Sequence, residues 1–260
     1  MHLSDKSRLE TLALTAVEMA RTYGAISRRY FRTDLLVESK SDNSPVTIAD
    51  KETELALRSE IQKRFPGHGI VGEEYGNIEA KDDEGFTWVL DPIDGTKSFI
   101  AGIPLYTMLI ALLRDGEPVF GLIHQPVSNE MLWAANGLGA WIDGKPARVS
   151  TTKALTDAKL ILTDPTMFCA DCGSFADRLI RSVKYSRSWG DGYGYLLVAT
   201  GRADVMVDPR MNLWDVAPMR PILTEAGGRL TTITGKEALG ADSLATNGLL
   251  HEHVLALHKS

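Results

Sequence analysis

The chain has 260 residues, which is enough for one large domain or two small ones. Its composition, with 44% hydrophobic and 24% charged residues, is ordinary for a globular protein and excludes collagen, coiled-coil and disordered chains. The formal net charge of −6 at pH 7 excludes a protein built to coat nucleic acid, because that binding needs clustered Lys and Arg side chains.

Neither a membrane span nor an export signal is predicted from the apolar segments. The longest apolar stretch, Tyr106 to Leu113, is far shorter than the roughly 20 residues that a membrane helix needs, and Arg114 ends it. Acidic residues interrupt the apolar residues near the N-terminus, which does not fit a signal peptide. Two cysteines are too few for a disulfide framework. These features predict a cytoplasmic protein with no membrane partner.

The first part of the chain has the pattern of two helices. Apolar residues recur at helical spacing over residues 8–31, which predicts an amphipathic helix. The polar stretch Ser39 to Pro45 is typical of a loop. Thr47 is a suitable N-cap for a second helix that runs to Phe65. Pro66-Gly67 would end that helix.

Strand signals follow the second helix. Short strands are expected at residues 69–72 and 87–90. Between residues 105 and 150, apolar runs alternate with two-residue turn signals that are typical of hairpins, and this part is predicted to be an antiparallel meander. The turn signals are Asp115-Gly116, Asn136-Gly137 and Asp143-Gly144.

After residue 155 the pattern changes to strands that alternate with helices. Apolar runs at 160–162 and 204–207 predict strands, and helices are expected near 174–183, 192–200 and 215–226. Such alternation is typical of an α/β layer. We therefore expect a boundary near residue 150, with an N-terminal half (1–150) and a C-terminal half (151–260) that share one site between them.

The most informative segment for chemistry follows the strand expected at 87–90. Asp91 ends the strand, and Pro92 favours a turn that would bring Asp91 and Asp94 together. Gly95 permits a close backbone approach to a ligand, and Thr96 is expected to open a short helix whose free N–H groups suit a phosphate.

Two carboxylates on one tight turn repel each other unless a cation lies between them. Hard divalent cations such as Mg²⁺ take oxygen ligands of this kind and also bind substrate phosphates. Each acid considered alone is typical of a solvated surface residue, and the Asp91–Asp94 segment alone is compatible with a plain β-turn. The further acidic candidates are Asp50, Glu73, Glu74 and Asp215.

Four segments together resemble the inositol monophosphatase family of Mg²⁺-dependent phosphatases, and the resemblance covers nearly the whole chain. Trp88 to Thr96 is similar to the first family signature, and Leu213 to Ala217, followed by Glu225 to Gly228, is similar to the second. Val71 to Glu74 and Val46 to Asp50 match its two upstream acidic segments. The resemblance implies a layered αβαβα sandwich of α+β or α/β class, and a homodimer.

The resemblance also implies a site and a mechanism. A water molecule activated by two or three Mg²⁺ ions would attack phosphorus directly, without a phospho-enzyme. Glu73 and Thr96 would orient and deprotonate this water, Asp50 would accept a hydrogen bond from Thr96, and the Gly95 and Thr96 amides would stabilise developing charge. Pro218 departs from the family pattern and is expected to alter the helix start after Asp215. The implied metal ligands are Glu73, Asp91, the Ile93 carbonyl, Asp94 and Asp215.

Segments of the C-terminal half resemble the histidinol-phosphate phosphatase branch of this family, notably Arg187 to Tyr195 and Ala203 to Asp208. Histidinol phosphate carries an ammonium group and an imidazole, so acids at the mouth of the site would favour it. Asp191 and Asp208 are the candidates, although Asp191 could instead cap a helix and Asp208 could simply end a strand. The substrate-binding candidates are Asp94, Gly95, Thr96, Arg187, Gly190, Asp191 and Asp208.

Several alternatives remain open at this point. Within enzymes, they are an inositol-1-phosphate phosphatase, a broad sugar-phosphate phosphatase, and a phosphatase of bisphosphate nucleotides. A regulatory binding protein on the same fold is an alternative of another class. A Cys-x5-Arg phosphatase loop at Cys172 is disfavoured, because Asp177 next to Arg178 would repel phosphate. His251 and His253 lack metalloprotease spacing and are expected on a solvated helix face.

Overall fold

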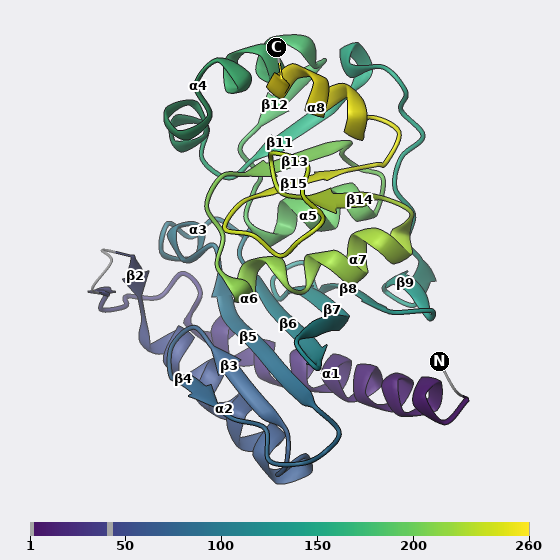
Figure 1. Ribbon diagram of the computed structural model, residues 1–260. Helices are drawn as coiled ribbons and strands as arrows, with labels where there is room; N and C mark the ends of the chain where they lie inside the picture. The colour runs from purple at the N-terminus through teal and green to yellow at the C-terminus, as the bar shows by residue number, and fades with distance from the viewer. Residues whose placement is uncertain (1–2, 41–43, 260) are drawn as a thin grey trace.

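Two long helices form the first layer of the fold in this computed structural model, which describes residues 3–40 and 44–259 (Figure 1). Helix α1 (Leu3–Tyr30) begins earlier than the predicted residue 8. Helix α2 (Ile48–Arg64) has the predicted cap, because the Thr47 hydroxyl accepts a hydrogen bond from the Ala49 amide at 3.1 Å. Ahead of α2, a small hairpin pairs β1 (Glu38–Ser39) with β2 (Pro45–Val46).

The second layer is an eight-stranded sheet that contains the predicted antiparallel meander. Its turns have the backbone that their residues favour: at Asp115-Gly116, φ is 52° and 85°, as two-residue hairpins require. One pair, β3 with β5, is parallel, so the sheet is mixed. In sheet order the strands are β10 (Lys145–Pro146), β9 (Gly139–Ile142), β8 (Glu130–Ala135), β7 (Glu117–Gln125), β6 (Thr107–Arg114), β5 (Phe86–Asp94), β3 (Gly69–Gly72) and β4 (Gly76–Ile78).

The C-terminal part of the chain forms a five-stranded mixed sheet with its own helices. β11 pairs in parallel with β12 and β13, whereas β15 pairs antiparallel with β13 and β14. The strands are β11 (Lys159–Leu162), β12 (Tyr185–Arg187), β13 (Val205–Asp208), β14 (Arg229–Thr231) and β15 (Ser243–Thr246). The helices are η1 (Leu155–Asp157), α4 (Pro165–Ser182), α5 (Gly192–Ala199), α6 (Leu213–Val216), α7 (Met219–Ala226) and α8 (His251–Lys259).

The layers follow in the order helix, sheet, helix, sheet, helix, which confirms the predicted αβαβα sandwich (Figure 1). α1 and α2 cover one face of the large sheet. α5 and α7 lie between the two sheets, and α4 and α8 cover the outer face of the small sheet. Strand alternation explains this packing: Leu160 and Leu162 face α4 and α8, whereas Ile161 faces the middle layer.

The middle layer unites both sheets in one core. Leu109 and Ile123 of the large sheet belong to the same buried cluster as Ile161 and Met206 of the small sheet. The predicted boundary near residue 150 falls in the connection between β10 and β11, and the division into halves stays a prediction.

Among the described residues, none of the helices is long and apolar enough to cross a membrane.

Three local predictions were wrong. β5 continues through Asp94 instead of ending at a turn after Asp91, with a register irregularity between the two residues. The helix expected over 215–226 is interrupted, because Pro218 lies between α6 and α7. His251 is fully buried rather than solvated, and its ring nitrogens contact the hydroxyls of Thr231 and Thr246.

A row of small residues lets the α6–α7 segment lie close to the large sheet. Ala111, Gly121 and Ala134 are paired neighbours on β6, β7 and β8. A Cβ atom at Gly121 would lie 2.0 Å from the Pro218 carbonyl oxygen. Gly121 is therefore required by this close backbone approach, which holds α6 against the end of β5.

We expect Gly121→Ala to destabilise the protein by about 1–3 kcal/mol, because the added methyl group must push β7 and the Pro218 carbonyl apart. The measurement is the midpoint of urea unfolding with an unchanged m-value. An unchanged midpoint would contradict the close contact between β7 and the α6–α7 segment.

Candidate active site

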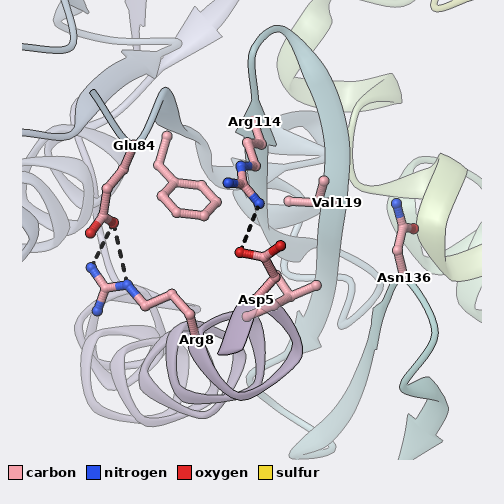
Figure 2. Close-up of a pocket in the computed structure, with 8 residues that line it drawn as sticks. Asp5, Arg8, Glu84, Arg114, Val119 and Asn136 are labelled. Carbon is pink, nitrogen blue, oxygen red and sulfur yellow. Dashed lines mark hydrogen bonds and ion pairs between the residues drawn. The ribbon is translucent and has the colours of Figure 1, made fainter. Parts of the chain in front are cut away.

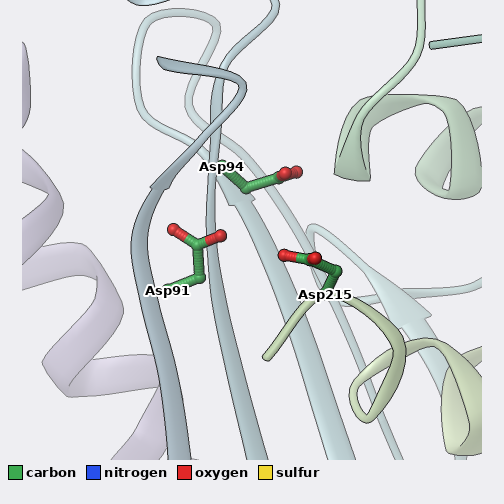
Figure 3. Close-up of side chains that lie close together, drawn as sticks. All are labelled: Asp91, Asp94 and Asp215. Atoms are coloured by element: carbon green, nitrogen blue, oxygen red, sulfur yellow. The ribbon is translucent and has the colours of Figure 1, made fainter. Parts of the chain in front are cut away.

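Three carboxylates from two separate elements point toward one another at the end of β5 (Figure 3). Asp91 and Asp94 come from β5 and Asp215 comes from α6, and one oxygen of each lies within 4.8 Å of the others. The Ile93 amide donates to Asp91 Oδ1 at 3.0 Å, which fixes the orientation of the Asp91 carboxylate. The irregular end of β5, rather than the predicted β-turn, brings the two β5 acids to the same place.

Local helix chemistry positions Asp215. It is the third residue of α6, and its Oδ2 accepts a hydrogen bond from the Asn212 amide at 2.7 Å. This is a capping box, in which the side chains of the first turn satisfy the free backbone amides. The carboxylate is therefore held by backbone at the start of a helix that packs next to β5.

The cluster carries more negative charge than its surroundings stabilise. Burial raises the pKa of Asp91 well above its ordinary value, and the charges of Glu73, Asp94 and Asp215 raise it further. Burial also raises the pKa of Asp94, with Asp191 and Asp215 adding to the effect. For Asp215, burial is the main cause that raises the pKa to about 7.

This donor set fits a hard divalent cation. Carboxylate oxygens that converge from different elements are the ligands that Mg²⁺ and similar ions prefer, and such an ion would neutralise the mutual repulsion. The structure brings together the predicted ligands Asp91, Asp94 and Asp215, and their role as ligands stays a prediction.

Glu73 lies beside this cluster on the turn after β3. Its Oε1 accepts a hydrogen bond from Lys40 Nζ at 2.7 Å, and the same ammonium group donates to Glu74 at 2.8 Å. Lys40 thus places a positive charge against the acids that precede β4. Sequence reasoning missed Lys40, because no local pattern links it to a glutamate 33 residues away.

One predicted contact is wrong. Thr96 was expected to donate to Asp50, but its hydroxyl donates to the Ile93 carbonyl at 3.1 Å. The Asp50 carboxylate instead accepts hydrogen bonds from the Thr47 amide and hydroxyl, at 2.9 and 2.6 Å. The physical reason is local: Thr96 starts α3 (Thr96–Ile100) and reaches back by three residues, while Asp50 completes the capping box of α2.

Asp94 connects the large sheet to the middle layer. Its Oδ2 accepts hydrogen bonds from the Thr107 hydroxyl on β6, at 3.0 Å, and from the Gly192 amide at the start of α5. A Cβ atom at Gly192 would lie 2.6 Å from that same oxygen, so only glycine permits the contact. Thr107 is a second residue that the sequence pattern did not reveal.

A pair of cavities opens next to the three carboxylates. One, of about 260 Å³, is lined by Glu73, Gly95, Thr96 and Lys97 among others. The other, of about 100 Å³, is lined by Asp94, Asp208 and Asp215 among others. Both cavities share three lining residues, Thr163, Met167 and Asp191. The predicted phosphate-binding turn and the predicted substrate acids therefore face adjoining spaces.

Thr163 connects the two candidate substrate acids. Its hydroxyl donates to Asp208 Oδ2 at 2.7 Å and accepts from the Asp191 amide at 3.2 Å. Burial raises the pKa of Asp191 to about 6, and the charge of Asp208 contributes. Burial likewise raises the pKa of Asp208. These two acids are held in place but lack a positive partner strong enough to offset their burial.

The remaining predicted substrate residues lie differently. Gly190 packs against backbone, since a Cβ atom there would lie 2.3 Å from Thr163 Cα. Arg187 is exposed on β12 with its guanidinium 5.3 Å from the centre of the Tyr185 ring, and it lies outside both cavities. The structure therefore does not bring Arg187 to the site.

A separate cavity of about 210 Å³ lies near the start of β5 and the end of β6, away from the three carboxylates (Figure 2). Its charged side chains pair with each other: Arg8 Nη2 lies 2.8 Å from Glu84, and Arg114 Nη1 lies 3.7 Å from Asp5. None of the predicted site residues is among the described residues that line it.

Comparisons with known proteins give matches over nearly the whole chain. Residues 8–259 match the sequence profile of the inositol monophosphatase family. A histidinol-phosphatase of Chlorobaculum parvum is 37% identical over 93% of this chain and 94% of its own length. An inositol-1-monophosphatase of Caulobacter vibrioides is 33% identical over 95% of this chain and 97% of its own. The solved structure of extragenic suppressor protein suhB from Bartonella henselae superposes with a TM-score of 0.90 and 25% identity, covering 96% of this chain and 99% of that one.

We expect the protein in EDTA to lose stability as the pH rises. The pKa of Asp215 is raised from 3.8 to about 7 in the folded state, so its stabilising contribution is complete below about pH 4 and is lost as the pH passes 7. The measurement is the Tm in EDTA between pH 5 and 8. Added Mg²⁺ should raise the Tm most at pH 8, because it binds the folded cluster.

Asp91→Asn tests the repulsion among the three carboxylates. In EDTA at pH 8 this variant should be more stable than the parent chain by roughly 1–2 kcal/mol, or roughly 2–8 °C in Tm, because one buried charge is removed. Its gain in Tm on adding Mg²⁺ should be smaller. Asp83→Asn, at an exposed acid, serves as the control and should behave as the parent chain. Equal Mg²⁺ responses in all three proteins would contradict the assignment of the cluster.

Proposed function

This chain belongs to the inositol monophosphatase family and is a phosphatase, and from that premise we propose that it hydrolyses L-histidinol phosphate to L-histidinol and phosphate with Mg²⁺ as cofactor. The observation that carries the substrate assignment is a pair of acids, the half-buried Asp191 and the buried Asp208, which line the smaller cavity beside Asp94 and Asp215. The relative from Chlorobaculum parvum is named a histidinol-phosphatase, which supports the same substrate. Such a reaction belongs to histidine biosynthesis.

The three-carboxylate cluster would hold the cations together with Glu73 and the Ile93 carbonyl. Bound there, divalent cations supply positive charge for the phosphoryl oxygens and lower the pKa of water. Asp91, Asp94 and Asp215 set the position of that charge, because β5 and α6 fix their side chains.

The chain's own groups would orient the substrate phosphate and the attacking water. Gly95 has φ of 82° and turns the backbone from β5 into α3, so that the first amides of α3 belong to residues that line the larger cavity, Thr96 and Lys97. These amides are suited to donate to phosphate oxygens. Glu73 also lines this cavity, and its carboxylate is suited to accept a proton from water.

Asp191 and Asp208 would recognise the leaving group. Histidinol presents an ammonium group and an imidazole, whereas inositol presents only neutral hydroxyls. A cation in the smaller cavity, which both acids line, would favour their charged forms. It would therefore act against burial, which raises the pKa of both acids. Inositol-1-phosphate is the second candidate substrate, because the relative from Caulobacter vibrioides is named an inositol-1-monophosphatase.

The first experiment is phosphate release by the purified protein with Mg²⁺ and with EDTA. L-Histidinol phosphate, inositol-1-phosphate and adenosine 3′,5′-bisphosphate are compared by kcat/KM. We expect Mg²⁺-dependent activity, with kcat/KM for histidinol phosphate higher by at least about tenfold. One desolvated charge contact of roughly 1.4 kcal/mol accounts for a preference of that size. Preference for inositol-1-phosphate would contradict the substrate assignment but not the assignment of the metal cluster.

Asp208→Asn tests the recognition step. It preserves the shape of the side chain and removes its charge, so kcat/KM should fall more for histidinol phosphate than for inositol-1-phosphate. A fall of about tenfold in the ratio is expected from the loss of one buried charge contact. An equal fall for both substrates would show that Asp208 acts only on the structure of β13 and Thr163.

A further inference from the structure

The N-terminal part of α4 lies over the candidate substrate cavity. A non-helical residue, Gly173, with φ of 51° and ψ of −126°, breaks the helix. A Cβ atom there would meet nothing within 4 Å, so glycine is needed for its backbone conformation rather than for space. The break separates the segment 165–172 from the rest of α4. Met167 of this segment lines both cavities beside the carboxylates.

Asp171, one turn after Met167, forms an ion pair with Arg210. Arg210 Nε lies 2.6 Å from Asp171 Oδ2, and Arg210 Nη2 lies 2.9 Å from Oδ1. Two parallel contacts of this kind fix the plane of the guanidinium. The backbone amide of Arg210 also donates to Asp208 Oδ1 at 3.1 Å. The ion pair therefore links α4 directly to the loop that follows a candidate substrate acid.

The charge of Arg210 matters because of its location. Arg210 is the one basic residue among the described residues that line the smaller cavity, which also has four aspartates, and its side chain is largely exposed. A free guanidinium there would repel a cationic leaving group and would attract a second phosphate. Asp171 offsets that charge and directs the guanidinium toward α4.

We propose that Asp171 is a specificity-determining residue, which pairs with Arg210 so that the site accepts a phosphomonoester with a cationic leaving group and disfavours a second phosphate. This inference rests on the proposed function for its choice of cationic substrate. Asp171 acts through Arg210 and is a positioning residue rather than a catalytic one.

The test is Asp171→Asn, which keeps the shape of the side chain and frees the charge of Arg210. The ratio of kcat/KM for histidinol phosphate to that for inositol-1-phosphate should fall about three- to tenfold. The Ki of adenosine 3′,5′-bisphosphate as a competitive inhibitor should fall by a similar factor. Both changes should shrink in about 0.5 M NaCl, since the freed charge is exposed to salt.

Two further variants separate charge from structure. The double variant Asp171→Asn with Arg210→Met lacks both charges and should recover the selectivity ratio of the parent chain. Asp177→Asn is the matched control, because it breaks the Arg181–Asp177 pair of 2.7 Å on the same helix, outside both cavities. It should leave the ratio unchanged.

Three outcomes would overturn the proposal. They are an unchanged ratio in Asp171→Asn, an equal loss of kcat/KM for all substrates, and a failure of the double variant to recover the ratio. The proposed function fails separately, if the parent chain does not prefer histidinol phosphate. If the parent chain does not prefer histidinol phosphate, the effect of Asp171→Asn on the kcat/KM ratio is still measurable. The ratio compares a substrate that has a cationic leaving group with one that has a neutral leaving group.

Discussion

Mutual repulsion among three partly or fully buried carboxylates is the constraint on which the site depends. Asp91, Asp94 and Asp215 lie within 4.8 Å of one another, and burial together with like charge raises the pKa of each. Placing such groups together costs free energy unless a cation joins them. The irregular end of β5 and the capping box of α6 maintain the arrangement despite that cost.

The fold provides the close packing that this arrangement needs. The α6–α7 segment lies close to the large sheet where small residues are paired neighbours on β6, β7 and β8, and a Cβ atom at Gly121 would clash with the Pro218 carbonyl. The same middle layer presents Gly192 to Asp94. The site is therefore built from both sheets, and its geometry depends on the core that unites them.

Charge balance also governs the candidate substrate side. Thr163 holds Asp191 and Asp208 in place without neutralising them, which leaves that side suited to a cation. Arg210 would weaken this preference if it were free, and Asp171 offsets its charge. Under the proposed function, recognition of phosphate and recognition of the leaving group would be separate tasks of the β5–α3 segment and of the β13 region.

Much of the fold was determined by local signals in the sequence. Examples are the Asp-Gly turns, the Thr47 cap and the strands near residues 70 and 160. Each depends on contacts between residues a few positions apart, so its pattern can be recognised in the sequence alone. The family motifs likewise named Asp91, Asp94 and Asp215 together. Only the tertiary structure decided the pairings of Lys40 with Glu73 and of Asp171 with Arg210, the hydrogen bond of Thr96 to Ile93 rather than Asp50, and the burial of His251. Charged pairs between distant segments follow no short-range rule, because their geometry exists only after the layers have packed.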